Sequence, residues 1–175
     1  MTSEEAFEFA RKHGPSDKTR KIACEKPNYA ILYAEYVDKK PRDDTRKATC
    51  KDPRHALQYA INIDKKPRKD IRKIVCKDPF YAFLYAENVD KCPRDDTREA
   101  ACKDPWWAYF YAKDIDRRPR NDTREAACKD PKAAYNYAQD VDKKLKNHTW
   151  KAIQNTEYEK KYYRSLNQPE KDKII

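Results

Sequence analysis

Residues 76–101 read CKDPFYAFLYAENVDKCPRDDTREAA, and closely related stretches precede and follow them. Cysteines align these stretches, each 26 residues after the last, at Cys24, Cys50, Cys76, Cys102 and Cys128. Most copies share C-K-D-P, then A-x-x-Y-A-x-x-V/I-D, then P-R-x-D-T-R. A fixed period of this length is typical of a chain built from stacked structural repeats. The sequence therefore predicts a solenoid.

Each repeat contains the signals of two helices. The first helix begins at Asp-Pro, as at Asp78-Pro79, because Asp is a good N-cap and Pro is favoured at the first helical position. The apolar residues that follow share one helical face, and in repeat three they are Ala82, Tyr85, Ala86 and Val89. The second helix is short and is held by its neighbours. Its predicted N-terminal caps are Asp44, Asp70, Asp96 and Asp122.

The composition agrees with helices. Gly occurs once in 175 residues, whereas tight strand turns use Gly heavily. No apolar run approaches the ~20 residues needed to span a bilayer, and the N-terminus does not read as a signal peptide. We expect an all-α fold, an α-solenoid of about six tandem two-helix repeats with degenerate capping repeats, located in the cytoplasm and not in a membrane.

The repeat also sets the predicted boundaries. A single α-helical repeat domain covers residues 1–166. Its full repeats, numbered one to five, are residues 24–49, 50–75, 76–101, 102–127 and 128–153. Residues 1–23 form an N-terminal cap, residues 154–166 form a C-terminal cap helix, and residues 167–175 form a tail.

Cysteine and histidine do not form a reactive or metal-binding set. Equivalent positions in successive repeats lie about 8–10 Å apart, which exceeds the ~7 Å limit on the Cα separation of a disulfide. Zinc sites use close pairs such as C-x-x-C, which the sequence lacks. The histidines, His13, His55 and His148, occupy different repeat positions. We expect reduced cysteines packed as small apolar residues, no metal, no cofactor and no enzymatic activity.

Arginine recurs at two places in each repeat. One series lies in the turn between the helices, at Arg42, Arg68, Arg94 and Arg120. The other lies on the second helix, at Arg20, Arg46, Arg72, Arg98 and Arg124. Each series could face phosphates or bond to the equally recurrent aspartates. A residue type present in every repeat is more typical of a scaffold, so the second interpretation is favoured.

The basic excess, a net charge of +10, is unevenly distributed. Repeat two has eight Lys and Arg against three acidic residues, and repeat three has four against six. Repeat five is again basic. An acidic repeat three argues against one continuous nucleic-acid groove but leaves two basic patches. This alternative site for DNA or RNA consists of Arg54, Lys65, Lys66, Arg68, Lys69, Lys73, Lys143, Lys144 and Lys146.

Four positions of the first helix vary between repeats, and in repeats three and four all are large and apolar. They are Phe80, Tyr81, Phe83, Leu84, Trp106, Trp107, Tyr109 and Phe110. Two interpretations remain open. The favoured one is an exposed patch that binds a protein partner, because aromatic clusters are typical interface anchors. The other is that these residues form core between repeats or mediate self-association. Stacking of the aromatic rings on nucleic-acid bases is a variant of the first interpretation.

The motif CKDPxxAxxYAxxVDKxPRDDTREAA, which covers residues 24–153, resembles short α-helical repeats of predicted phage proteins with runs of the type DPxxAYxYAxxV. In architecture alone it is similar to HEAT-like arrays. The resemblance implies a viral protein in the host cytoplasm, with inhibition of a host protein as one role, and it implies no catalytic residues. The sequence-based hypothesis is a non-enzymatic helical-repeat binding or scaffold protein with a protein partner. Its oligomeric state is left open.

Overall fold

The structure is a computed structural model, and it describes residues 1–166. These residues are helical and include no strand, which confirms the all-α prediction. None of their helices has both the length and the apolar character that a membrane-spanning segment requires. The predicted tail, residues 167–175, lies outside the described residues.

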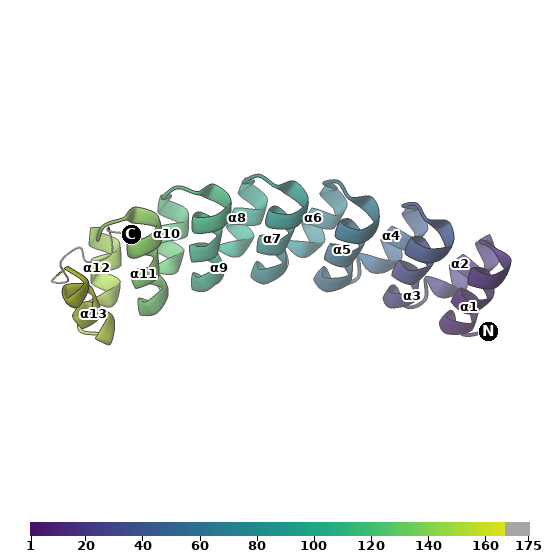
Figure 1. The fold of residues 1–175 in the computed structure, drawn as a ribbon, viewed down its shortest axis with the longest axis horizontal. Helices are drawn as coiled ribbons and strands as arrows, with labels where there is room; N and C mark the ends of the chain where they lie inside the picture. The colour runs from purple at the N-terminus through teal and green to yellow at the C-terminus, as the bar shows by residue number, and fades with distance from the viewer. Residues whose placement is uncertain (167–175) are drawn as a thin grey trace, which may run out of the picture. The chain divides into compact units, whose positions relative to one another are not determined.

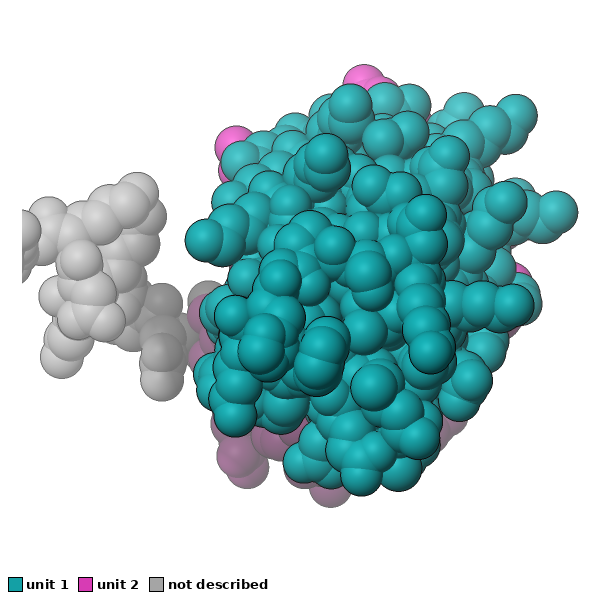
Figure 2. Space-filling model, turned by 90° about the vertical axis from the view of Figure 1, so that its right-hand side faces the viewer, with its two compact units in different colours: residues 1–100 teal, residues 101–175 magenta. Residues whose placement is uncertain are grey.

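The chain divides into two compact units, which Figure 2 distinguishes by colour. Unit 1 comprises residues 1–100, and unit 2 comprises residues 101–175. Within each unit, the first helices of successive repeats lie side by side in one layer, and the second helices form another (Figure 1). This stacking of helix pairs confirms the α-solenoid. The prediction of a single domain over residues 1–166 stays a prediction.

Unit 1 contains the N-terminal cap and repeats one to three. Its first helices are α1 (Ser3–His13), α3 (Pro27–Leu32), α5 (Pro53–Tyr59) and α7 (Pro79–Tyr85). The last three continue into π-helical segments η1 (Tyr33–Asp38), η2 (Ala60–Asp64) and η3 (Ala86–Asp90). Its second helices are α2 (Asp17–Ala23), α4 (Asp43–Thr49), α6 (Lys69–Val75) and α8 (Asp95–Ala101), the last of which ends at the boundary with unit 2.

Unit 2 repeats the same order of elements. Its first helices are α9 (Pro105–Phe110) and α11 (Pro131–Tyr137), followed by η4 (Tyr111–Asp116) and η5 (Ala138–Asp142). Its second helices are α10 (Asn121–Ala127) and α12 (Asn147–Ile153). The predicted C-terminal cap helix is α13 (Glu157–Leu166), which packs against α11 and α12.

The predicted Asp-Pro start of the first helix is confirmed. The Asp52 carboxylate accepts a hydrogen bond of 3.0 Å from the backbone N–H of His55. Asp78 accepts from the backbone N–H groups of Phe80 and Tyr81. Lys26 occupies the same place in repeat one and makes no such bond. The cap therefore depends on the side-chain oxygen, as expected for an N-cap residue.

Each π-helical segment ends at a basic residue with left-handed backbone. In repeat two, the backbone N–H of Lys65 donates to the carbonyl of Ala60 at 2.9 Å, and Lys65 has a φ of 51°. Asp64, directly before it, has a side chain with no solvent exposure. The same backbone recurs at Lys39, Lys91, Arg117 and Lys143. The wide last turn thus places an aspartate inside the fold and a basic residue at the turn.

Lys65→Gly is expected to raise the free energy of unfolding by about 0.5–1 kcal/mol, because left-handed backbone strains an L-residue more than the added flexibility of Gly costs. Urea denaturation measures the change. Lys66→Gly is the matched control, since Lys66 has no positive φ. Lys66→Gly should lower the free energy of unfolding by a similar amount, so the two substitutions should have opposite signs. A change of the same sign and size in both variants would contradict the expectation.

The predicted caps of the second helix are wrong. Asp44 is the second residue of α4, and the N-cap position belongs to Arg42, which makes no side-chain cap bond. Asp70, Asp96 and Asp122 likewise lie one residue inside α6, α8 and α10. In α4 the cap comes from the next repeat. The Tyr59 hydroxyl accepts from the backbone N–H of Arg42 at 3.0 Å and donates to its carbonyl at 3.1 Å.

Candidate interaction surfaces

The arginines of the second helix are structural. Arg46 donates from Nε and Nη2 to the two carboxylate oxygens of Asp64, each at 2.8 Å, and from Nη1 to Asp43 at 2.6 Å. The hydrogen bond to Asp64 raises the pKa of Arg46. Equivalent bidentate pairs are Arg20–Asp38, Arg72–Asp90 and Arg124–Asp142. For these pairs the scaffold interpretation is confirmed, because the guanidinium groups are already occupied.

The turn arginines also lie close to aspartates. Arg68 Nε is 3.6 Å from Asp64 Oδ1, and Arg94 Nε is 3.3 Å from Asp90 Oδ1. Arg42 and Arg120 lie 3.6 Å and 3.3 Å from the aspartates two residues later in the chain. The turn arginines are therefore partly neutralised by the scaffold.

The cysteines are free thiols. The repeat-equivalent ones are partly buried at the ends of the second helices, and burial raises the pKa of Cys24 and of Cys128 to about 11. Such thiols carry little thiolate and react slowly. Cys92 is exposed in the turn after η3. Among residues 1–166, no group of three or more His, Cys, Asp or Glu could hold a metal ion.

The variable positions of the first helix divide into core and surface. Phe83 and Tyr109 occupy the third position and are 6% and 3% exposed. They belong to the core and are not available to a partner. Phe80 is 37% exposed. The others are partly buried, namely Tyr81, Leu84, Trp106, Trp107 and Phe110.

Unit 1 exposes one large apolar residue on each of three successive first helices, and we call these residues, with their partly buried neighbours, the first-helix face. Tyr36 is 54% exposed, Ile61 is 42% exposed, and Phe80 is the third exposed member. Leu32 and Leu84 are partly buried members of the same face. Sequence reasoning missed Tyr36 and Ile61, because they lie beyond the four positions that were compared. Their spacing of seven or eight residues from the first variable position was the available signal.

Unit 2 carries an aromatic cluster along α9, made of Trp106, Trp107 and Phe110. The ring of Phe110 lies 6.2 Å from that of Trp106 and 5.6 Å from that of Trp107, between centroids. Lys132 Nζ, from the next first helix, is 5.4 Å from the Trp106 ring centroid. Trp106 and Phe110 also pack against the buried core of unit 2. The cluster is thus partly core, and its rings remain partly accessible.

A polar group beside this cluster links two repeats. Lys113 Nζ lies 2.7 Å from Asp140 Oδ2 and 3.0 Å from the Tyr109 hydroxyl, which donates to the same carboxylate oxygen. The hydrogen bond to Asp140 raises the pKa of Lys113. These groups satisfy one another and join α9 to η5, so we assign them to the scaffold.

In unit 1, Arg54 lies apart from the other basic residues of the nucleic-acid alternative. Lys65 and Lys66 lie in the turn after η2, and Lys143, Lys144 and Lys146 lie in the turn after η5. Arg54 lies near the start of α5, at the opposite end of the first helix from its turn. Arg68, Lys69 and Lys73 line an open hollow of about 700 Å³ beside α4 and α6. Asp43 and Asp70 line it too, so its charge is mixed.

Comparison of the chain with protein-family models, with curated proteins and with solved structures gave no match. The structure shows a helical-repeat architecture, whereas the viral context suggested by the motif stays a prediction.

Proposed function

We propose that the chain is a non-enzymatic helical-repeat binding protein that docks a protein partner on its first helices. The observation that carries this proposal is the first-helix face of unit 1. Charged residues make up 40% of the chain, yet Tyr36, Ile61 and Phe80 are exposed on three successive first helices. Single exposed apolar residues are ordinary, but a set on adjoining helices is typical of an interaction surface.

The aromatic cluster of unit 2 is the second part of the proposal. Tryptophan is enriched among the residues that dominate binding energy, especially where part of the ring is already desolvated. Trp106 and Trp107 meet this description, Phe110 packs beside both rings, and Lys132 adds a cation beside the Trp106 ring. Phe83 and Tyr109 are left out because they are buried.

The phage-like motif suggests a setting for this binding. In that setting the partner is a host protein, and the chain acts in the host cytoplasm as an inhibitor or decoy. Binding without catalysis is favoured because the polar clusters described above are pairs that hold the scaffold together.

A triple variant, Tyr36→Ser with Ile61→Ser and Phe80→Ser, is expected to reduce partner capture from the native host lysate by about tenfold or more, because interface anchors each contribute over ~1 kcal/mol. The chosen residues are exposed, so the fold should persist. Quantitative mass spectrometry of captured proteins, with circular dichroism of each variant, measures both effects.

The matched control removes exposed residues from the second helices, with Lys21→Ser, Lys47→Ser and Lys73→Ser. It should capture the same partner as the unchanged chain. Trp106→Ala with Trp107→Ala tests the unit 2 cluster in the same experiment. Undiminished capture by both surface variants, with folding intact, would show that the partner binds elsewhere.

A further inference from the structure

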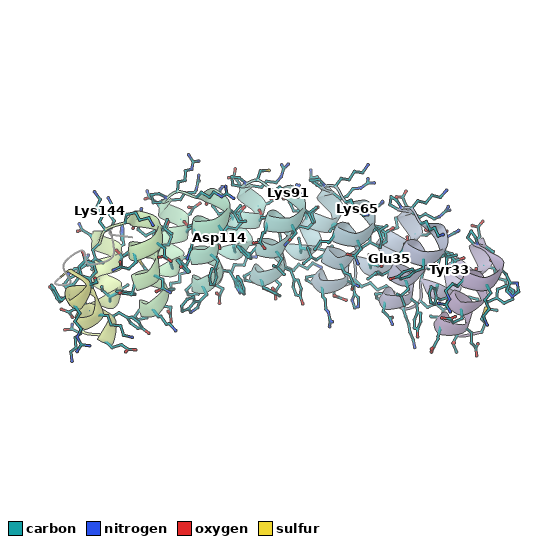
Figure 3. All side chains as sticks on the ribbon, in the orientation of Figure 1. Tyr33, Glu35, Lys65, Lys91, Asp114 and Lys144 are labelled. Atoms are coloured by element: carbon teal, nitrogen blue, oxygen red, sulfur yellow. The ribbon has the colours of Figure 1, made fainter. Side chains whose placement is uncertain are left out.

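Basic residues follow the first helices of unit 1 at the turns. They are Lys39, Lys40, Lys65, Lys66 and Lys91, which we call the lysine row. All are exposed. Figure 3 shows Lys65 and Lys91 at the same edge of unit 1, where each first helix ends. Unit 2 repeats the pattern at its own turns, with Arg117, Arg118, Lys143 and Lys144.

The lysine row is not neutralised by the fold. Within residues 1–166, none of its lysines forms an ion pair or a side-chain hydrogen bond. The carboxylates directly before the row are occupied, since Asp38 bonds to Arg20 at 2.8 Å, Asp64 to Arg46 at 2.8 Å and Asp90 to Arg72 at 2.6 Å. The aspartates of the scaffold are therefore paired with arginines, and the positive charges of the row lysines are left without a partner within residues 1–166.

The backbone at this row is unfavourable for lysine. Lys39, Lys65 and Lys91 have φ values of 53°, 51° and 53°, in the left-handed region that Gly adopts most readily. A positive charge near a helix C-terminus complements the helix dipole, which accounts for one lysine at each turn. It does not account for the second lysine, Lys40 or Lys66. Strained backbone is often retained at functional positions. Its recurrence with a basic residue at each turn indicates that these positive charges have a function.

We propose that the lysine row of unit 1 binds the phosphate backbone of a nucleic acid. Unpaired lysines in turn segments that lack aromatic residues suit sequence-independent phosphate contacts. A protein partner fits less well, because lysine is depleted at protein interfaces and aromatic anchors are enriched there. The turn segments 39–42, 65–68 and 91–94 contain no aromatic residue.

The spacing of the row fits a phosphate chain. Helices of successive repeats pack roughly 8–10 Å apart, so three turns span roughly 16–20 Å. One strand of a duplex advances about 3.4 Å per phosphate, and about five phosphates cover that span. Each lysine of the row can then meet its own phosphate.

The acidic net charge of repeat three does not interrupt the lysine row. Counting charge by repeat makes repeat three acidic. Asp90, however, is bonded to Arg72, and Asp96 lies 3.8 Å from the same guanidinium. These carboxylates belong to the scaffold, so Lys91 continues the row through repeat three.

The test compares two variants of the full chain with the same loss of charge. The row variant carries Lys39→Asn, Lys40→Gln, Lys65→Asn, Lys66→Gln and Lys91→Asn. Asn is used at the left-handed positions because it tolerates that backbone. The control variant replaces Lys21, Lys47, Lys51, Lys77 and Lys103 with Gln, which are exposed lysines away from the turns that follow the first helices. Fluorescence anisotropy of labelled RNA and DNA duplexes, about 30 base pairs long, measures binding across a salt series.

For the unchanged chain and a duplex, five phosphate contacts predict roughly a 500-fold loss of affinity between about 50 and 200 mM salt. The row variant should bind roughly tenfold or more weakly at the lower salt, with a shallower salt dependence. The control variant should stay within about threefold of the unchanged chain. Circular dichroism confirms that each variant is folded.

Three results would overturn the proposal: no binding at low salt, equal losses in both variants, or competition by polyglutamate as strong as that by nucleic acid. The last result would indicate an acidic protein partner. Capture of a protein on the first-helix face is measured separately and should persist in the row variant, so the two proposals can fail independently.

Discussion

Asp64→Ala is expected to lower the free energy of unfolding by roughly 3–5 kcal/mol, which is the usual cost of removing one partner from a buried ion pair. The Asp64 side chain has no solvent exposure, and it accepts two hydrogen bonds of 2.8 Å from Arg46. Arg46 is itself 5% exposed. Without Asp64, most of the guanidinium is left inside the fold with one partner, Asp43. Urea denaturation followed by circular dichroism measures the loss.

Asp43→Ala is the matched control, because Asp43 bonds to the same arginine from the surface. Its distance to Arg46 Nη1 is 2.6 Å, but its side chain is 86% exposed. Exposed pairs contribute little, so we expect a loss within about 1 kcal/mol. Equal losses for the two aspartates would mean that burial does not govern the energy of this pair, and the scaffold role assigned to Asp64 would not hold.

The Arg46–Asp64 pair also shows what joins neighbouring repeats. Arg46 lies in repeat one and Asp64 in repeat two, eighteen residues later. The Tyr59 ring lies under the same guanidinium, with its centroid 5.8 Å from Cζ. Helices this short are not stable alone. The stability of unit 1 is therefore expected to depend on such contacts between neighbours, as in other repeat proteins.

The parts of the fold that could be predicted are those encoded locally. The positions of α7 and its equivalents were predicted from an Asp-Pro pair followed by apolar residues at helical spacing. Asp78 caps α7 as expected. The predicted cap of α4 was wrong because the group that accepts the backbone hydrogen bond is not local. The hydroxyl that replaces it belongs to Tyr59, seventeen residues beyond Arg42 and in the next repeat. Such a contact becomes visible only when two repeats are stacked.

The candidate surfaces were partly predictable. Phe83 precedes Ala86 by three residues and is buried with it, whereas Phe80 is exposed and Leu84 is partly buried against the core of unit 1. Charge was harder to interpret. In a net-charge count, Asp90 and Lys91 cancel each other. In the structure, however, Asp90 forms an ion pair with Arg72, and Lys91 is unpaired within the described residues. The net charge of each repeat therefore did not reveal the lysine row.

Tyr59→Phe is expected to cost roughly 1–3 kcal/mol of unfolding free energy, because removing the hydroxyl leaves buried polar groups without a partner. The hydroxyl is the acceptor for the Arg42 N–H at the start of α4, and it lies 2.8 Å from Thr45 Oγ1. Burial raises the pKa of Tyr59, so the hydroxyl keeps its proton near neutral pH.

Two further Tyr→Phe variants make this expectation specific. Tyr36→Phe is the matched control, since Tyr36 is 54% exposed, and it should change the free energy of unfolding by less than about 0.5 kcal/mol. Tyr85→Phe should cost less than Tyr59→Phe, because Ile71 stands where repeat one has Thr45. Within residues 1–166 the Tyr85 hydroxyl therefore hydrogen-bonds only to the backbone of Arg68. The order Tyr59, Tyr85, Tyr36 in urea denaturation would support capping by the following repeat. If Tyr59→Phe costs no more than Tyr36→Phe, the hydroxyl does not stabilise the start of α4.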